Sequence, residues 1–287
     1  MLDQLVVYLG LVRCSLDFEV RETDEQEEFR VWFRSWLEEN IPKNMDIPPD
    51  GRVLSDDAQI KLKEFRLKLG SKGWLAPSWP VALGGGGMDV SLGEIIRDEC
   101  SKLNLPTIGN NLRWVPAMMV WGTPEQKKDY IPPALRGETV TWQMFSETAS
   151  GSDIASTATS AVRDGSDWLV SGRKAFITGR TVDPDYLCTL AVTDHDRPRR
   201  LNLGVFMINA SLPGISIVTQ SLLTGSERHV YLDNVRIPTG CLIGDPYQGW
   251  EIVQTIIEGE RGGQFFRGTE EATIDSILEY LRGGSED

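Results

Sequence analysis

The sequence contains only two histidines, His195 and His229, among its 287 residues. Neither has a second histidine at the spacing of a zinc site, so the sequence supports no zinc centre. So few candidate bases also disfavour a Ser-His-Asp or Cys-His mechanism. The four cysteines form no Cys-x-x-Cys pair, which leaves a zinc ribbon and a thioredoxin-type dithiol unsupported.

Positive charge and long apolar runs are also scarce. Lys and Arg number 29 against 42 Asp and Glu, a net charge of −13, and a nucleic-acid backbone repels so acidic a chain. The apolar run from Leu5 to Val12 is too short for a bilayer, which takes about 20 apolar residues, and no signal-peptide cleavage site follows it. We therefore expect no nucleic-acid partner and no membrane attachment. Scattered free cysteines without an export signal favour a cytoplasmic location.

The remaining composition is that of a globular protein long enough for about two domains. Residues 20–136 have helical periodicity. Thr23–Gln26 has the form of a capping box, Ser55 precedes a second helix, and Thr123–Gln126 begins another with proline at its first position. The stripes expected to face a core are Phe29, Trp32, Phe33, Trp36 and Leu37 in the first helix and Ala58, Leu62, Phe65 and Leu69 in the second.

Residues 137–246 change to short runs rich in Val, Ile, Thr, Phe and Tyr, separated by Gly, Pro and Asp. They lack the long helices that a parallel Rossmann sheet needs between its strands, so we predict a small antiparallel barrel or sandwich. His229 falls in the last run, and we interpret it as structural. The predicted strands span 139–146, 168–171, 186–193, 203–208, 215–221 and 228–235.

Residues 247–287 are helical again, with an apolar stripe from Ile252 to Ile257 and another from Ile274 to Leu281. So short a helical segment cannot close its own bundle. We therefore expect a truncated bundle whose apolar patch, from Ile252 to Leu281, is exposed or covered by another chain.

Four segments have residues suited to ligand binding, each with a plainer alternative. Gly84–Gly87 is predicted to be a flexible turn, because neither the Lys-Ser nor the Lys-Thr of a P-loop follows it. Ser146–Asp153 consists of small and hydroxyl residues that allow close approach of a ligand, or form an ordinary turn. Lys174–Gly179 places an aromatic residue before a hydroxyl, which suits a flat heterocycle or a core residue and a turn. Glu258–Gly263 combines two carboxylates with a guanidinium, or is a solvated helix end.

Taken together and in this order, the segments resemble the acyl-CoA dehydrogenase family, from about residue 20 to residue 282. The resemblance implies an α+β fold with an N-terminal helical domain (20–136), a middle β-barrel or sandwich domain (137–246) and the start of a truncated C-terminal helical domain (247–287). The blocks that carry it are Trp79-Pro80 with the glycine run, Gly122–Glu138, Ser146-Glu147 with Gly151-Ser152-Asp153, Lys174–Thr178, Asp233–Pro238, and Gly244-Asp245 with Gln248–Trp250.

The resemblance also implies chemistry. Members of the family bind FAD and oxidise an acyl-CoA thioester in fatty acid metabolism: a carboxylate removes the α-proton and the β-hydrogen leaves as hydride to flavin N5. Electron-transfer flavoprotein usually reoxidises the flavin. The flavin site reaches across a subunit interface, so a homo-oligomer or a hetero-oligomer with a related subunit is expected.

Residue roles follow from the same resemblance. Glu260 is placed as the α-proton base, since some family members carry a Glu there, and burial would raise its pKa towards the operating pH. The Thr178 hydroxyl is expected near N5, where a donor stabilises the developing charge. The expected flavin contacts are Gln143, Phe145, Ser146, Phe176, Ile177 and Thr178, and the expected acyl-CoA contacts are Ser152, Glu258 and Arg261.

The sequence departs from the family pattern at several points. Thr148 replaces the signature proline, Phe176 the usual tryptophan, and Gly179 a common asparagine. The family's next flavin segment, an Arg-x-x-Phe-Gly type, has no counterpart here. Two alternatives follow: a catalytically inactive or fragmentary pseudo-subunit, and a related oxidase or flavin monooxygenase.

Overall fold

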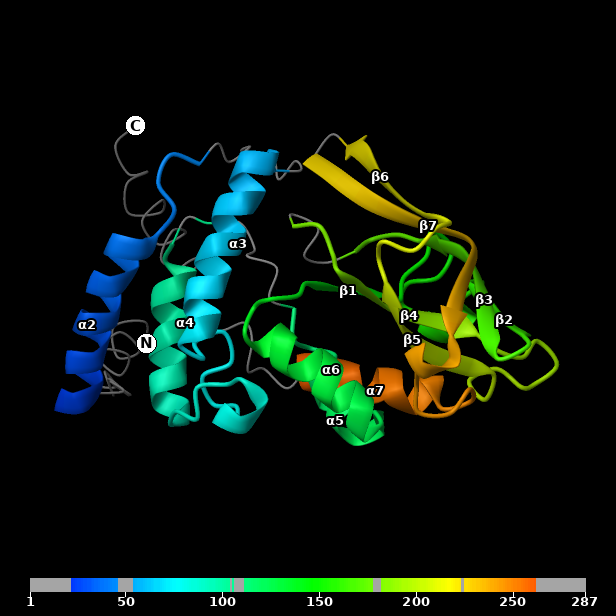
Figure 1. The fold of residues 1–287 in the computed structure, drawn as a ribbon, viewed down its shortest axis with the longest axis horizontal. Helices are drawn as coiled ribbons and strands as arrows, with labels where there is room; N and C mark the ends of the chain where they lie inside the picture. The colour runs from blue at the N-terminus through cyan, green and yellow to red at the C-terminus, as the bar shows by residue number, and fades with distance from the viewer. Residues whose placement is uncertain are drawn as a thin grey trace, which may run out of the picture.

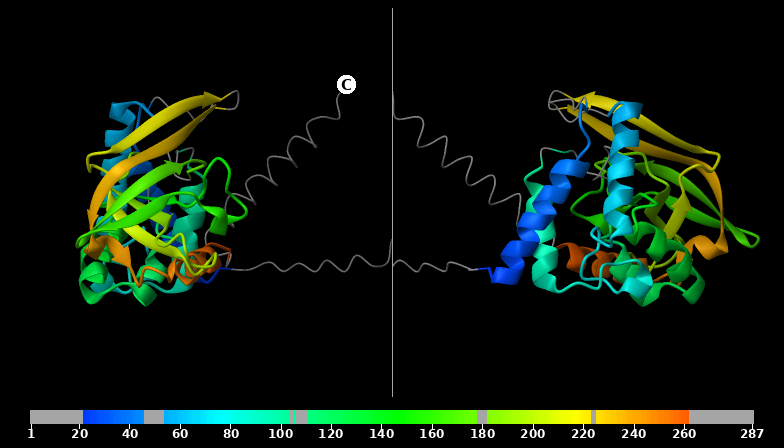
Figure 2. Two further views of the ribbon diagram at one scale, coloured as in Figure 1. Left: turned by 90° about the vertical axis from the view of Figure 1, so that its right-hand side faces the viewer. Right: turned by 60° about the vertical axis from the view of Figure 1, so that its left-hand side comes forward.

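The computed structural model describes residues 22–45, 54–103, 105, 111–177, 182–222 and 225–261. Helices come first, an eight-stranded sheet follows, and helix α7 ends the described chain (Figure 1). The helical elements before the sheet are α2 (Asp24–Asn40), α3 (Asp56–Ser71), η1 (Val81–Leu83), α4 (Val90–Ser101), α5 (Val115–Trp121) and α6 (Pro124–Leu135). Figure 2 shows α2, α3 and α4 side by side at one end of the molecule, with α5, α6 and α7 grouped along the sheet.

The predicted helix starts are confirmed by their caps. The Thr23 hydroxyl accepts the Gln26 N–H at 3.3 Å while the Gln26 side chain accepts the Thr23 N–H at 2.8 Å. Thr123 and Gln126 repeat this reciprocal pair at the start of α6. Ser55 caps α3 through the Ala58 N–H. Each cap satisfies a backbone donor that a helix N-terminus leaves unpaired.

The N-terminal core forms where α2, α3 and α4 meet. The α3 stripe is buried as predicted, from Ala58 to Leu69. In α2, Phe33 and Leu37 are buried, but Trp32 is 51% exposed, so its assignment to the core face was wrong. Its ring lies at the margin of the cluster and meets Trp74 edge to face, with centroids 5.6 Å apart.

The sheet confirms the strand-rich middle of the chain. Its order is β6-β7-β3-β2-β4-β5-β8, with β1 paired to β4. Most neighbours are antiparallel as predicted, but β1 and β2 both run parallel to β4, which a long crossover allows. The strands are β1 (Thr141–Met144), β2 (Ser160–Asp164), β3 (Asp167–Lys174), β4 (Tyr186–Val192), β5 (Leu203–Asn209), β6 (Ile215–Leu222), β7 (Gly225–Pro238) and β8 (Leu242–Ile243), with η2 (Ile154–Ser156) and η3 (Thr239–Cys241) between them.

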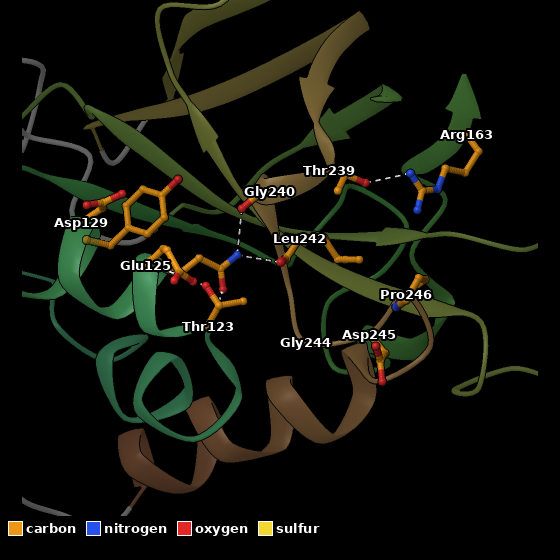
Figure 3. Close-up of a pocket in the computed structure, with 12 residues that line it drawn as sticks. Thr123, Glu125, Asp129, Arg163, Thr239, Gly240, Leu242, Gly244, Asp245 and Pro246 are labelled. Atoms are coloured by element: carbon orange, nitrogen blue, oxygen red, sulfur yellow. Dashed lines mark hydrogen bonds between the residues drawn. The ribbon is translucent and has the colours of Figure 1, made fainter. Parts of the chain in front are cut away.

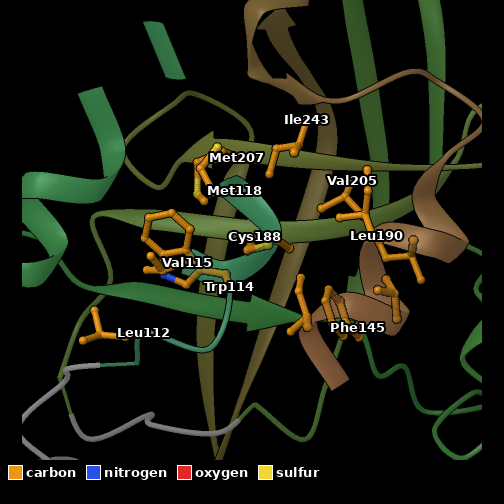
Figure 4. Close-up of a cluster of buried hydrophobic side chains, with 14 of the residues drawn as sticks. Leu112, Trp114, Val115, Met118, Phe145, Cys188, Leu190, Val205, Met207 and Ile243 are labelled. Carbon is orange, nitrogen blue, oxygen red and sulfur yellow. The ribbon is translucent and has the colours of Figure 1, made fainter. Parts of the chain in front are cut away.

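The apolar face of α7 (Gly249–Arg261) is not the exposed patch that we expected. Ile252, Val253 and Ile256 are buried in the cluster that joins α5 to β4 and β5. Figure 4 shows this cluster, in which Val115 and Met118 of α5 approach strand residues. Side chains from the sheet and α5 therefore cover the helix within this chain. The second predicted stripe, 274–281, lies outside the described residues.

The glycine run forms the predicted turn, but close packing rather than flexibility explains its composition. A Cβ on Gly85 would lie 2.4 Å from the Trp79 carbonyl oxygen, and one on Gly86 2.8 Å from that of Pro77. The Gly85 and Gly86 N–H groups donate to the Pro80 and Ala76 carbonyls. The turn therefore packs against its own preceding loop.

Candidate functional site

The two segments predicted to contact a flavin lie side by side. One follows β1 and the other follows β3. The Ala175 N–H donates to the Ser146 carbonyl at 3.0 Å. The Lys174 ammonium donates to the Phe145 carbonyl at 3.3 Å. The fold thus joins two stretches that are far apart in the sequence.

A buried ion pair stands beneath this junction. Lys174 Nζ lies 2.9 Å from Glu147 Oε1, with side chains 0% and 8% exposed. The same ammonium donates to Thr157 Oγ1 at 2.8 Å. Glu147 also accepts the Thr159 N–H at 2.9 Å and hydroxyl at 2.6 Å. The pair is therefore fully hydrogen-bonded, as a buried charge pair must be to persist.

The surroundings shift the pKa of both groups. Burial lowers the pKa of the Lys174 ammonium to about 8, although Glu147 favours its charged form. Burial alone would raise the pKa of Glu147. The charge and hydrogen bond of Lys174 and the hydroxyls of Thr157 and Thr159 outweigh it and bring that pKa down to about 2. Both groups are charged at neutral pH.

Sequence reasoning missed this pair. Glu147 and Lys174 stood in the motif blocks, but neither was given a role. The available signal was a charged residue shortly after each of two predicted strands. A charge in such a position needs a partner if it is buried.

Phe176 has an unusual backbone conformation. Its φ is 55°, a left-handed value that bulky residues seldom adopt. Its ring is 58% exposed, whereas Ile177 beside it is buried. The Phe176 N–H donates to Glu227 Oε1 at 2.7 Å. The backbone thus turns the aromatic ring outward at the end of β3.

The other predicted flavin residues divide between surface and core. Ser146 is half-buried, and Gln143 is half-buried on β1. Phe145 and Ile177 pack into the two large core clusters, so they offer a ligand their backbone rather than their side chains. Thr178 lies outside the described residues.

These residues fit a flavin ring in their chemistry. The Gln143 Oε1 atom is buried and has no hydrogen-bond partner among the described residues. A buried acceptor without a donor is costly, and a ring N–H would satisfy it. Phe176 supplies an exposed apolar surface and Ser146 a hydroxyl. A flat heterocycle with a polar edge matches this set.

The predicted acyl-CoA residues lie elsewhere on the surface. Ser152 is exposed on the turn after β1, where its neighbour Asp153 pairs with Arg199. Glu258 is exposed on α7. Glu260 and Arg261 end the same helix, but their side chains lie outside the described part. Among the predicted residues that the structure describes, it brings Phe145 and Ser146 beside the segment that contains Phe176 and Ile177, and it places Ser152 and Glu258 elsewhere.

A separate cavity of about 580 Å³ lies between α6 and the η3–β8 link (Figure 3). Its described lining includes Asp129, Tyr130 and Asp245, and Arg163 donates to Thr239 Oγ1 at 2.7 Å. The residues predicted to bind flavin or acyl-CoA are not among those that line it. This cavity is therefore not the predicted site.

Two domain families match the chain. Residues 23–138 match the acyl-CoA dehydrogenase N-terminal domain, and residues 143–235 match the acyl-CoA dehydrogenase middle domain. The chain belongs to the acyl-CoA dehydrogenase family. The first matched region overlaps the expected 20–136 domain and extends two residues past it, and the second lies inside the expected 137–246 domain.

Curated acyl-CoA dehydrogenases are similar over most of this chain. "Acyl-CoA dehydrogenase FadE34" of Mycobacterium tuberculosis (strain ATCC 25618 / H37Rv) is 31% identical over 219 residues, 75% of this chain and 30% of that protein. "Acyl-CoA dehydrogenase FadE29" of the same strain is 31% identical over 198 residues, 68% of this chain and 51% of that protein. The chain thus spans about a third of the length of the first relative and about half of the second.

Solved acyl-CoA dehydrogenase structures share the fold. The "Tcur3481-Tcur3483 steroid ACAD G363A variant" superposes with a TM-score of 0.77 at 26% identity, over 92% of this chain and 69% of that chain. The ChsE4-ChsE5 complex from Mycobacterium tuberculosis gives a TM-score of 0.67 at 25% identity, over 84% and 61%. Within the described residues, no helix has both the length and the apolar character needed to cross a bilayer.

Proposed function

We propose that this chain acts in the FAD-dependent α,β-dehydrogenation of an acyl-CoA thioester, as one subunit of a cytoplasmic oligomer. The observation that carries the proposal is the junction of the segments after β1 and β3. Ala175 is bonded there to Ser146, and the Phe176 ring is turned outward beside it. Because the chain belongs to the acyl-CoA dehydrogenase family, we assign these two segments to FAD binding.

FAD, when bound, supplies the acceptor for the hydride that leaves the β-carbon. Ser146, Gln143 and Phe176 are the described residues that would hold it, and Thr178 is assigned the donor at its reacting edge. Glu260, in the last turn of α7, is assigned the removal of the α-proton. Ser152, Glu258 and Arg261 are assigned to the CoA arm.

A partner subunit is part of the proposal. Two similar structures are named for two components, Tcur3481-Tcur3483 and ChsE4-ChsE5. By analogy, we propose that a homologous subunit completes the FAD site and that electron-transfer flavoprotein accepts the electrons. The related alternative is an inactive subunit that supports a catalytic partner.

Visible absorption of the purified chain tests the proposal. We would record spectra before and after adding FAD, then after adding butyryl-CoA or a steroid-derived acyl-CoA, the latter because one of the similar structures is a steroid ACAD. Flavin bands that bleach with an acyl-CoA would support the function. A colourless chain that takes up no FAD would overturn activity by this chain alone. Oxygen consumption during turnover would instead indicate an oxidase.

A variant of the assigned base tests the mechanism. Glu260→Gln keeps the size of the side chain but removes its basicity, so flavin binding is expected to persist while bleaching by acyl-CoA falls at least 100-fold. Glu251→Gln is the matched control, since Glu251 is exposed on the first turn of the same helix. Full activity in Glu260→Gln would refute the assignment.

A further inference from the structure

A buried carboxylate is aimed at the backbone of Phe176. Glu227 is 8% exposed, and its Oε1 atom accepts the Phe176 N–H at 2.7 Å across 51 residues of sequence. The bond is charge-assisted and therefore stronger than one between neutral groups. It acts on a residue whose φ of 55° is uncommon for an aromatic side chain.

The register of the sheet places Glu227 there. β3 ends at Lys174, which pairs with Val230 of β7. β7 continues past that end towards Gly225, where Glu227 pairs with Gln220 of β6. The extra length of β7 thus lies beside the chain that leaves β3. A carboxylate on this overhang can reach the first free N–H groups after the strand.

Another polar side chain lies near the Glu227 carboxylate. His229 lies two residues along the strand, on the same face, and its Nε2 atom is 3.7 Å from Glu227 Oε2. The other ring nitrogen of His229 is 3.1 Å from an Arg173 guanidinium nitrogen. Glu227 and His229 are therefore buried polar neighbours, with the exposed Arg173 on the far side of the His229 ring, and the second oxygen of Glu227 has a neighbour other than Phe176.

Backbone strain of this kind persists only where the surroundings impose it, and it gathers at ligand sites. A phenylalanine in ordinary conformation would be free to turn its ring into the core, where apolar side chains are stabilised. Here the ring is 58% exposed. The hydrogen bond thus keeps an apolar ring on the surface, at the place where the proposed cofactor binds.

We propose that Glu227 is a positioning residue: by accepting the Phe176 N–H, it fixes the left-handed backbone and holds the Phe176 ring as one wall of the cofactor site. This inference rests on the proposed function for the identity of the ligand. The effect on the ring itself does not depend on any ligand.

The test follows the ring and the ligand separately. 4-Fluorophenylalanine is placed at position 176 by site-specific incorporation, and its ¹⁹F resonance is recorded in the full chain without FAD. The dissociation constant for FAD is then measured by flavin fluorescence. Glu227→Ala removes the acceptor, Glu227→Asp shortens its reach, and Glu227→Gln retains an oxygen acceptor. Asp233→Asn, at an exposed position of the same strand, is the control.

We expect Glu227→Ala to shift the ¹⁹F resonance and weaken FAD binding at least 10-fold. Glu227→Asp, the milder change if the alanine variant does not fold, is expected to alter both in the same direction. Glu227→Gln should stay within about 3-fold of the parent, because an amide oxygen can accept the same N–H. Asp233→Asn should change neither readout.

Two results would overturn the inference. One is an unmoved ¹⁹F resonance in Glu227→Ala and Glu227→Asp. The other is a Glu227→Gln variant that loses FAD binding as strongly as Glu227→Ala while its own ¹⁹F resonance stays in place. That result would mean that the Glu227 charge acts directly on the ligand. If the parent chain binds no FAD, the proposed function fails for this chain, and the resonance alone still decides whether Glu227 positions the ring.

Discussion

Replacing Glu147 by glutamine would leave the Lys174 ammonium buried without a counter-charge. The Lys174 side chain is 0% exposed, and the remaining partners of its ammonium are the Phe145 carbonyl and the Thr157 hydroxyl. Removing one partner of a buried ion pair costs about 3–5 kcal/mol. Since a domain is stable by only about 5–15 kcal/mol, this single change removes a large part of the free energy of unfolding.

Urea denaturation followed by tryptophan fluorescence measures this loss. Glu147→Gln should lower the midpoint strongly, whereas Glu147→Gln with Lys174→Met should recover much of the difference, because the second change removes the unpaired charge. Asp153→Asn is the matched control, since it breaks an ion pair whose two side chains are both exposed, and it should leave the midpoint almost unchanged. A loss below about 1 kcal/mol in Glu147→Gln, or a double variant no more stable than the single one, would refute the reasoning.

Two further predictions concern stability. The folded-state pKa of Glu147, about 2, lies below its ordinary 4.5, so its ionised form contributes about 3 kcal/mol to the free energy of unfolding. This contribution is complete above pH 4.5 and is lost as the pH falls towards 2. Denaturation midpoints measured from pH 6 to pH 3 should therefore show a drop that Glu147→Gln lacks, and equal pH profiles for the two proteins would contradict this. Gly85→Ala should cost about 1–3 kcal/mol in thermal unfolding, because its Cβ would lie 2.4 Å from the Trp79 carbonyl oxygen. Gly151→Ala is the control, since nothing lies within 4 Å of its added Cβ, and equal melting temperatures for the two variants would contradict the packing argument.

The helix starts could be predicted from the sequence because their causes are local. A cap involves residues within one turn, as at Thr23 and Thr123, so a window of a few residues contains the whole interaction. β2 was not predicted, because its cause is not local. Its Ser-Ala-Val-Arg-Asp sequence is mostly exposed and lacks an apolar run, and its pairing with β3 defines it as a strand.

The burial of α7 could not be predicted in the same way. Its stripe was identified correctly, but what covers it depends on α5 and β5, which come earlier in the chain. A periodic pattern gives the apolar face of a helix and leaves its partner unspecified. The expected exposure of Ile252 to Ile256 was wrong because it assumed that only later helices pack there.

The site shows the same division between local and distant causes. The segments Ser146–Asp153 and Lys174–Gly179 were found through short motifs that resemble a family. The bond from Phe176 to Glu227 and the pair of Lys174 with Glu147 span 51 and 27 residues. Both depend on sheet register, which a single sequence with long crossovers does not fix.

The segments Ser146–Asp153 and Lys174–Gly179 contain both buried and accessible side chains, and this affects how variants in them should be interpreted. Glu147 and Lys174 point inward and hold the segments together, while Ser146 and Phe176 remain accessible beside them. A variant at an inward position therefore lowers stability and disturbs the binding surface at once, so loss of activity there does not identify a catalytic residue. Glu227 is buried as well, but it accepts the backbone N–H of the outward-facing Phe176, so its variants need a stability readout beside the ¹⁹F resonance. A change at Glu227 that moves the Phe176 resonance while the unfolding midpoint stays near that of Asp233→Asn would separate positioning of the surface from stability of the fold.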